Sequence, residues 1–327
     1  MPKVLLASPA LQTYQGAFLQ TLAAAGLEIV NPKLPRLLDE HDLLELLPPV
    51  EAVIAGSEPY TAAVIARSPK LRIIARAGVG YDAVDLEAAT RHGIAVTTTP
   101  GANHHAVADQ VMAFLLALAR RLVQFDGIVR ANAWKRWSPP SLNGATLGIV
   151  GFGRIGQAVA QRARGFELKL FAHDPYGNAE TARALGVELV ALDQLLRAAD
   201  FVSINCLVTD ETRGLINRES LALMKPTAYL INTARGELVD EASLHHALVS
   251  GRLAGAGLDV FATEPLPADS PLRQLDTVIL APHIAGLDSL SFHLMTLFAA
   301  EACVEVLSGG WPERFVVNPE AQANRRG

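Results

Sequence analysis

The sequence predicts an α/β protein made of two doubly wound parallel-sheet domains, with one domain inserted into the other. Short apolar, β-rich segments alternate with amphipathic, helix-like segments, which is typical of parallel sheets covered by helices on both faces. The alternation breaks once, at Thr99, Pro100 and Gly101, and a second alternating series begins at residue 146. The 327 residues are enough for two ordinary hydrophobic cores.

The first domain is expected to begin with a buried strand. Its strands are rich in Val, Ile and Leu, and its helices carry apolar residues at helical spacing. The expected strands are 4–6, 52–54, 72–75 and 94–97, and the expected helices are 16–26, 62–67 and 85–92. A final helix at 291–307 would return to this domain and close it.

A long helix is expected to lead into the second domain. Residues 103–129 have helical apolar spacing, and the stripe of Val111, Leu115, Leu118 and Leu122 is interpreted as core. Residues 134–140 are expected to be irregular, because they end in two prolines.

The second domain is expected to be one doubly wound sheet. Its expected strands are 146–150, 168–172, 201–205, 229–231, 255–260 and 278–280, and its expected helices are 154–164, 179–185 and 243–250. The predicted domains are therefore 1–99 with 288–327, and 100–287.

Composition excludes several classes of protein. Lys and Arg number 28 against 33 Asp and Glu, so the net charge of -5 provides no positive field for nucleic acid. The two cysteines, Cys206 and Cys303, are too few for a disulfide framework or a thiolate zinc site. The apolar stretches 4–7 and 111–119 are too short for a secretory signal or a membrane span. We expect a cytoplasmic protein with no nucleic-acid or membrane partner.

Three glycines follow the first strand of the second domain and open its first helix. In this position Gly151 permits a tight turn, Gly153 lets the backbone approach a pyrophosphate, and Gly156 lets helix and strand pack closely. The free N–H groups at the start of the helix would stabilise the diphosphate. The pattern predicts a Rossmann dinucleotide-binding domain.

Asp174 ends the next predicted strand, about 20 residues after the glycines, where a carboxylate accepts hydrogen bonds from the adenosine ribose. Its charge would repel a 2'-phosphate, which favours NAD over NADP. The alternative is a surface turn, since Asp before Pro commonly initiates one.

Three later segments place reactive side chains after predicted strands at one edge of the same sheet: Arg235, Glu264 and His283. Together they supply a cation for a carboxylate and carbonyl, an orienting carboxylate, and a proton donor, as hydride transfer to a keto acid requires. Taken singly, Arg235 and Glu264 could form a surface ion pair and His283 could be a loop histidine. Their joint placement after a nucleotide motif favours the catalytic interpretation.

These segments, with Gly56-Ser57-Glu58-Pro59 and Arg76-Ala77-Gly78-Val79-Gly80-Tyr81-Asp82, resemble the D-isomer-specific 2-hydroxyacid dehydrogenase family, in its phosphoglycerate dehydrogenase-like branch. The resemblance covers nearly the whole chain. It implies a Rossmann NAD-binding domain inserted into a flavodoxin-like substrate-binding domain, and a homodimer formed through the NAD-binding domain.

The resemblance also implies roles for individual residues. Arg235, Glu264 and His283 would be catalytic, and the backbone of Gly78, Val79 and Gly80 would bind the substrate carboxylate together with Arg235. The implied NAD site, beyond the glycines and Asp174, consists of Arg154, Ile155, Cys206, Thr212, Thr233, Asp259 and Gly286.

The chemistry of the three catalytic candidates is consistent with these roles. A bond from Glu264 to one imidazole nitrogen would fix the tautomer of His283 and favour its protonated form, so that it donates a proton to the developing alkoxide. Arg235 would hold the substrate through its planar fork, which Lys lacks. Leu207, Ala83 and Asp109 stand where the family often has Pro, Asn and Glu, outside the catalytic trio.

The sequence leaves other functions open. One is an NAD-sensing binding protein similar to the corepressors that share this fold, which would bind a partner without turnover. Another is a dehydrogenase of a different small anion, such as formate or phosphite.

Two further patterns favour structural roles over site roles. The adjacent pairs His104-His105 and His245-His246 point about 100 degrees apart on a helix, so no metal site is expected. The basic aromatic segment around Trp134 and Trp137 is interpreted as an interface or covered loop rather than an anion site.

Overall fold

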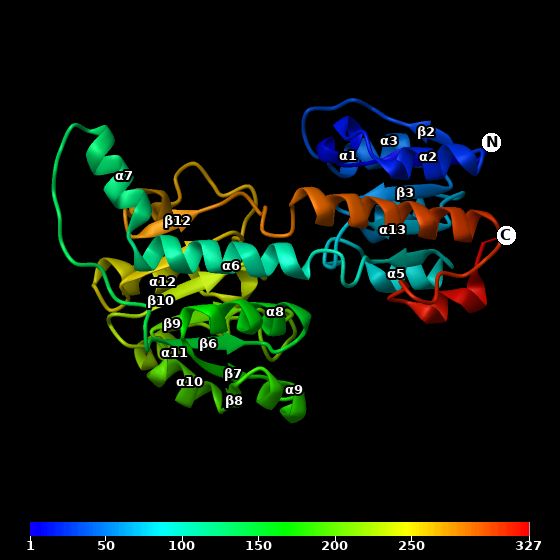
Figure 1. The fold of residues 1–327 in the computed structure, drawn as a ribbon. Helices are drawn as coiled ribbons and strands as arrows, with labels where there is room; N and C mark the ends of the chain where they lie inside the picture. Colours follow the sequence, from blue (N-terminus) through cyan, green and yellow to red (C-terminus); the bar gives the residue numbers. More distant parts are fainter. Residues whose placement is uncertain (327) are drawn as a thin grey trace. The chain divides into compact units, whose positions relative to one another are not determined.

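The chain divides into two compact units in the computed structural model, which describes residues 1–326 (Figure 1). Unit 1 holds Met1–Asn103 together with the chain from Leu287 onward, and unit 2 holds His104–Gly286. Each unit is built around its own parallel sheet.

The sheet of unit 1 has five parallel strands in the order β2-β1-β3-β4-β5. The strands are β1 (Lys3–Leu6), β2 (Glu28–Val30), β3 (Ala52–Ala55), β4 (Ile73–Arg76) and β5 (Ala95–Thr97). This is the flavodoxin-like order. Neighbouring residues in β1 face opposite cores, with Leu5 in one and Leu6 in the other, which explains the continuous apolar sequence of the strand.

Helices pack on the sheet of unit 1. They are α1 (Pro9–Thr13), α2 (Ala17–Ala24), α3 (Glu40–Leu46), α4 (Ala62–Ala66), α5 (Leu86–Arg91) and α13 (Ser289–Leu307). As predicted, α13 returns to this unit, where it contacts α2, β3 and β4. By length and composition α13 is apolar enough to cross a membrane, but its buried residues, including Cys303, belong to the core of unit 1.

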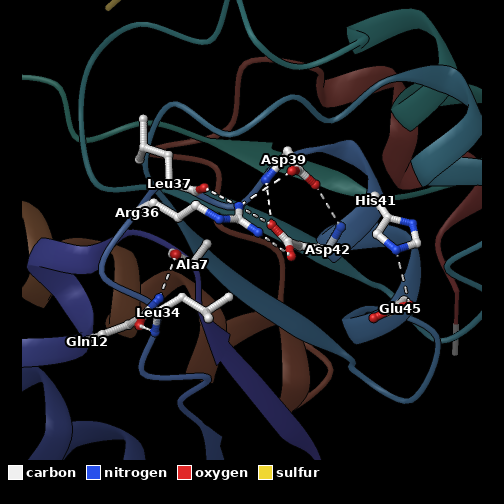
Figure 2. A network of polar contacts seen from close by, with 9 residues as sticks. All are labelled: Ala7, Gln12, Leu34, Arg36, Leu37, Asp39, His41, Asp42 and Glu45. Carbon is white, nitrogen blue, oxygen red and sulfur yellow. Dashed lines mark hydrogen bonds and ion pairs between the residues drawn. The ribbon is translucent and has the colours of Figure 1, made fainter.

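Polar contacts hold the segment that follows β2 (Figure 2). The side chain of Gln12 donates to Ala7 and accepts from the backbone N–H of Leu34. Asp39 caps α3, and Asp42 in that helix binds Arg36 at 2.5 Å.

The sheet of unit 2 has seven parallel strands in the order β12-β11-β10-β9-β6-β7-β8. The strands are β6 (Thr146–Val150), β7 (Lys169–His173), β8 (Val187–Leu189), β9 (Phe201–Ile204), β10 (Tyr229–Asn232), β11 (Gly255–Leu258) and β12 (Val278–Leu280). The first strand, β6, lies between β7 and β9, so the order reverses there, as in a Rossmann fold. The predicted fold class is confirmed.

In unit 2, helices cover both faces of the sheet, and each face has its own hydrophobic core. Its α-helices are α6 (His104–Ala119), α7 (Leu122–Arg130), α8 (Arg154–Ala163), α9 (Ala179–Ala184), α10 (Leu192–Ala198), α11 (Arg218–Leu223) and α12 (Glu241–Val249). Four short 3-10 helices complete the described chain: Arg164–Phe166, Gly236–Leu238, Pro271–Gln274 and Pro319–Asn324.

The prediction of one helix over 103–129 is wrong. The helix ends at Ala119, and Arg121 takes a left-handed backbone conformation (φ 49) that turns the chain into α7. Leu122, predicted as core, is 62% exposed, and α7 has no buried residue, whereas Val111, Leu115 and Leu118 are buried as predicted. Figure 1 shows α7 extending away from the sheet of unit 2.

Candidate active site

The glycine turn between β6 and α8 has the geometry that its sequence predicts. Gly151 has φ +92, and a Cβ added there would lie 2.6 Å from the backbone nitrogen of Cys206. A Cβ at Gly156 would lie 2.2 Å from the carbonyl oxygen of Gly151, so helix and turn are in direct contact. Gly153 has nothing within 4 Å of that position, and no side chain caps α8 there. The turn therefore leaves the helix start open to an anion.

The carboxylate of Asp174 lies against this turn, immediately after β7. Its Oδ2 accepts the backbone N–H of Phe152 at 2.7 Å, and its Oδ1 accepts that of Tyr176 at 2.9 Å. These bonds fix the carboxylate beside the glycines, where a ribose bound through its diphosphate would extend. Asp174 is thus more than a turn residue, and its position fits an NAD ribose.

The other residues predicted for the cofactor site lie around the same strand ends. Arg154 begins α8 and is exposed, and Ile155 follows it half-buried. Thr233 is buried after β10, and its hydroxyl has no hydrogen-bond partner within residues 1–326. The Thr212 hydroxyl donates to the Leu207 carbonyl at 2.6 Å and closes the loop after β9.

Cys206 begins that loop directly beside the glycine turn. Burial, assisted by the charge of Asp174, raises the pKa of its thiol to about 11. The thiol is therefore protonated at neutral pH, which excludes a role as a thiolate nucleophile.

His283 and Glu264 form the central contact of the site. His283 Nδ1 lies 2.7 Å from Glu264 Oε2, and the other carboxylate oxygen accepts the backbone N–H of Phe261 at 3.0 Å. Burial raises the pKa of Glu264, but its hydrogen bond to His283, the charge of His283 and the charge of Arg235 outweigh burial and leave that pKa below its ordinary value. The carboxylate is ionised and orients the ring so that Nε2 is left for a substrate.

Asp259, predicted to line the NAD site, holds the segment that carries His283. It is fully buried at the end of β11, and its carboxylate accepts the backbone N–H groups of Ile284 at 2.9 Å and Ala285 at 2.7 Å. Its carbonyl accepts the N–H of His283 at 2.8 Å. His283 itself has φ 53, a left-handed conformation that needs such support. Asp259 therefore positions the backbone of His283, a role that sequence spacing alone does not reveal.

Arg235 is positioned by two of its neighbours, which the sequence analysis did not identify. Asn232 accepts the backbone N–H of Ala234 at 3.0 Å and donates to the carbonyl of Arg235 at 2.8 Å. A Cβ added at Gly236 would lie 1.9 Å from the backbone of Phe261, so the Arg235 loop packs directly on the segment that leads to Glu264. In the sequence, the polar residue at the strand end and the glycine after Arg235 were the signals that could have identified these two neighbours.

The predicted carboxylate-binding loop lies in unit 1, after β4. Gly78, Val79 and Gly80 are at least partly exposed, and within the described residues 1–326 none of them donates its N–H to a backbone carbonyl. Three neighbouring N–H donors are therefore available to an anion. Gly286, the last residue of unit 2, ends the segment that carries His283.

The surroundings of Asp109 are structural. Asp109, a departure from the family pattern, binds Arg162 at 2.6 Å and so joins α6 to α8. No group of three or more His, Cys, Asp or Glu side chains within residues 1–326 is placed to hold a metal ion.

Comparison with known proteins agrees with this geometry. A family model described as D-isomer specific 2-hydroxyacid dehydrogenase, NAD binding domain, matches residues 112–285. A glyoxylate reductase of Korarchaeum cryptofilum is 44% identical over 266 residues, or 80% of each chain. A D-3-phosphoglycerate dehydrogenase of Mycobacterium tuberculosis is 46% identical over 251 residues, which are 76% of this chain but 47% of that longer one.

Solved structures are similar over almost the full length. The TT0316 protein of Thermus thermophilus has a TM-score of 0.87 and 40% identity, with 96% of this chain and 99% of that chain covered. A D-lactate dehydrogenase of Aquifex aeolicus, solved with NAD and lactic acid, has a TM-score of 0.85 and 28% identity over 97% and 99% of the two chains. The glycine turn, the strand order and these matches show that the chain belongs to the D-isomer specific 2-hydroxyacid dehydrogenase family and that unit 2 is its NAD-binding domain.

Proposed function

We propose that the protein transfers a hydride between NAD(H) and a small D-2-hydroxy acid or its 2-keto acid, with His283, Glu264 and Arg235 as its catalytic residues. The observation that carries this assignment is the 2.7 Å contact between His283 and Glu264, in the same unit as the glycine turn and at the carboxyl ends of its strands. An imidazole held by a carboxylate is the usual arrangement for a general acid and base.

His283 donates a proton from Nε2 to the carbonyl oxygen of the keto acid, and in the reverse direction accepts the hydroxyl proton. Glu264 keeps the ring in the required tautomer and stabilises its charged form. Arg235 binds the carboxylate and carbonyl oxygens, which orients the reacting carbon and stabilises negative charge as it develops on oxygen.

The cofactor supplies or accepts the hydride when it is bound. The open start of α8 binds its diphosphate, and Asp174 accepts hydrogen bonds from the ribose and repels a 2'-phosphate. The N–H groups of Gly78, Val79 and Gly80 bind the carboxylate of the substrate.

Replacement of His283 tests the assignment. We expect His283→Ala to lower kcat by about 10² to 10⁴, the usual contribution of a positioned acid and base. The measurement is NADH absorbance with glyoxylate, hydroxypyruvate and branched 2-keto acids. NADH binding, followed by fluorescence titration, should be retained, because the variant leaves the glycine turn and Asp174 unchanged.

His41→Ala is the control, since His41 is exposed on α3 and contacts Glu45 in the same helix. It should leave kcat unchanged. A native protein with no turnover of any keto acid, or a His283→Ala variant at the native rate, contradicts the assignment.

We further propose that two copies associate through α7 and the segment after it. This helix has no buried residue, and its exposed apolar side chains, together with Trp134 (79% exposed) and Trp137, form an apolar surface unusual for a monomer. Leu122→Glu should shift the protein from dimer to monomer in sedimentation velocity. Leu37→Glu, at an exposed leucine of unit 1, is the control and should not.

A further inference from the structure

The loop that carries Glu264 is bound by a side chain from another part of unit 2. Ala262, two residues before Glu264, donates its backbone N–H to Oε1 of Glu241 at 2.6 Å. The preceding N–H, that of Phe261, donates to Glu264 itself at 3.0 Å. Two consecutive N–H groups of the loop are therefore bound by carboxylates, one within the loop and one from a residue 21 positions earlier in the chain.

Glu241 begins α12 but does not cap it. The cap is Asp240, whose Oδ1 accepts the N–H groups of Ala242 at 3.1 Å and Ser243 at 3.2 Å. A carboxylate in the first turn also stabilises a helix through its charge, wherever its oxygens point. The bond from Glu241 to Ala262 is not needed for that effect, so it has a separate role in holding the loop.

The segment between Arg235 and Glu241 is fixed to the core of unit 2. Leu238 is fully buried, and Val239 forms a parallel bridge with Ile216. The N–H of Ile216 donates to the carbonyl of Leu238 at 2.9 Å, and the N–H of Asp240 donates to the carbonyl of Ile216 at 2.8 Å. Glu241 follows this bridge directly, so its carboxylate extends from a rigid part of the chain.

Gly236, in the same segment, contacts the same loop. A Cβ added at Gly236 would lie 1.9 Å from the carbonyl carbon of Phe261 and 2.3 Å from the nitrogen of Ala262. This steric contact resists closer approach of the two segments, and the hydrogen bond of Glu241 resists their separation. The loop is thus held in both directions by the segment that follows Arg235.

We propose that Glu241 is a positioning residue for proton transfer: through Ala262 it keeps Glu264 within hydrogen-bond distance of His283. The contact between Glu264 Oε2 and His283 Nδ1 is 2.7 Å long, and such a bond is largely lost beyond about 3.2 Å. A small displacement of the loop would therefore misalign the imidazole. The inference rests on the proposed function and adds a supporting residue to it.

Three substitutions of Glu241 separate its reach from its charge. Glu241→Ala removes the acceptor and should lower kcat about tenfold, with KM and NADH binding near their native values. Glu241→Gln keeps an oxygen at the same reach and should have nearly native kcat. Glu241→Asp keeps the charge but is too short to reach Ala262, and should be as slow as the Ala variant. The measurements are NADH absorbance with hydroxypyruvate and fluorescence titration of NADH.

Glu219→Ala is the matched control. Glu219 is an exposed carboxylate in the first turn of α11, in the same unit, so its removal costs a helix the same charge effect. It should leave kcat at the native value.

The pH dependence of reduction distinguishes positioning from a loss of stability. Reduction needs the charged imidazole, which Glu264 stabilises, and its rate declines with rising pH as the proton of His283 is lost. In Glu241→Ala and Glu241→Asp this decline should begin at a lower pH than in the native protein. A merely less stable helix would lower the rate without moving the pH dependence.

Hydrogen–deuterium exchange of the native protein tests the contact without any variant that must fold. Ala262 and Thr263 are both exposed, but the N–H of Thr263 donates to no protein acceptor within residues 1–326. With residue resolution, the amide of Ala262 should exchange more slowly than that of Thr263.

Equal exchange of these two amides, folded Ala and Asp variants with native kcat and pH dependence, or a Gln variant as slow as the Ala variant each overturn the inference. Failure of the proposed function is a different result, in which the native protein reduces no keto acid, and the exchange of Ala262 can still be read in that case.

Discussion

The two sheets present different chemistry at their carboxyl edges. In unit 2, Glu264 and His283 are joined by a 2.7 Å contact, and the loop of Arg235 packs on the segment before Glu264. In unit 1, Gly78 and its neighbours offer backbone N–H groups, and Arg76 at the end of β4 is buried. Proton transfer needs charged groups fixed to a fraction of an ångström, whereas carboxylate binding needs only neutral donors. Variants of unit 2 should therefore lower kcat, and variants of unit 1 should change KM.

Among the residues that support the site, the largest effect is expected at Asp259. Asp259→Ala removes the acceptor for the N–H groups of Ile284 and Ala285 and leaves both without their partner. We expect kcat to fall by about 10² or more with NADH binding retained, measured by steady-state kinetics and fluorescence titration. Asp259→Asn keeps one acceptor oxygen and should be intermediate. A native kcat in Asp259→Ala would mean that the segment of His283 is held by other contacts.

A matched pair of glycine variants separates the contribution of the two units. Gly236→Ala places a Cβ 1.9 Å from the backbone of Phe261, whereas Gly78→Ala meets nothing within 4 Å. We expect Gly236→Ala to lower kcat at least about tenfold and to lower Tm by several degrees, because overpacking displaces the loop. Gly78→Ala should keep the native Tm and kcat and raise KM. The comparison fails if the two variants change the same parameter.

The smallest effect is expected from the charge of Glu264. Its pKa in the folded protein lies below the ordinary 4.5, so its ionised form stabilises the fold above that pH, and this contribution is lost as pH falls through the lowered pKa. The side chain is about one-third exposed, and solvent screening limits the contribution to about 1 kcal/mol or less.

Urea denaturation of the native protein and of Glu264→Gln measures this contribution. The difference in unfolding free energy should be constant above about pH 5 and should shrink below pH 4.5. Glu45→Gln, at the exposed His41–Glu45 pair on α3, gives the reference for a surface contact. A difference that grows toward low pH would show that burial, rather than His283, dominates at Glu264.

Much of the fold follows from the sequence. Apolar strands alternating with helices, and glycines at the first turn of unit 2, were enough for both sheets and for the edge that carries Arg235, Glu264 and His283. The break between α6 and α7 was missed because apolar spacing continues past Arg120, and only the left-handed backbone of Arg121 ends the helix. Three-residue strands such as β2 and β8 are too short to show a period.

The supporting residues of the site were harder to predict. Asn232 acts on the backbone two and three residues further along. Asp259 acts on a segment that the folded chain brings near it, 25 residues further along in the case of Ile284. Arg76 lies beside Ala55 through the pairing of β3 with β4, which no local pattern reveals. The spacing of motifs indicates which residues form the site, whereas the residues that support them are found only from the folded structure.

The buried carboxylate of Asp259 also has a consequence for hydrogen–deuterium exchange. His283 and Ile284 have exposed side chains, yet their amides, like that of Ala285, donate to atoms of a residue with no solvent contact. Amides in exposed loops normally exchange quickly with solvent, whereas these three are hydrogen-bonded to a buried residue and should exchange slowly. In a labelling experiment the amides of residues 283–285 should exchange more slowly than those of the exposed residues around them.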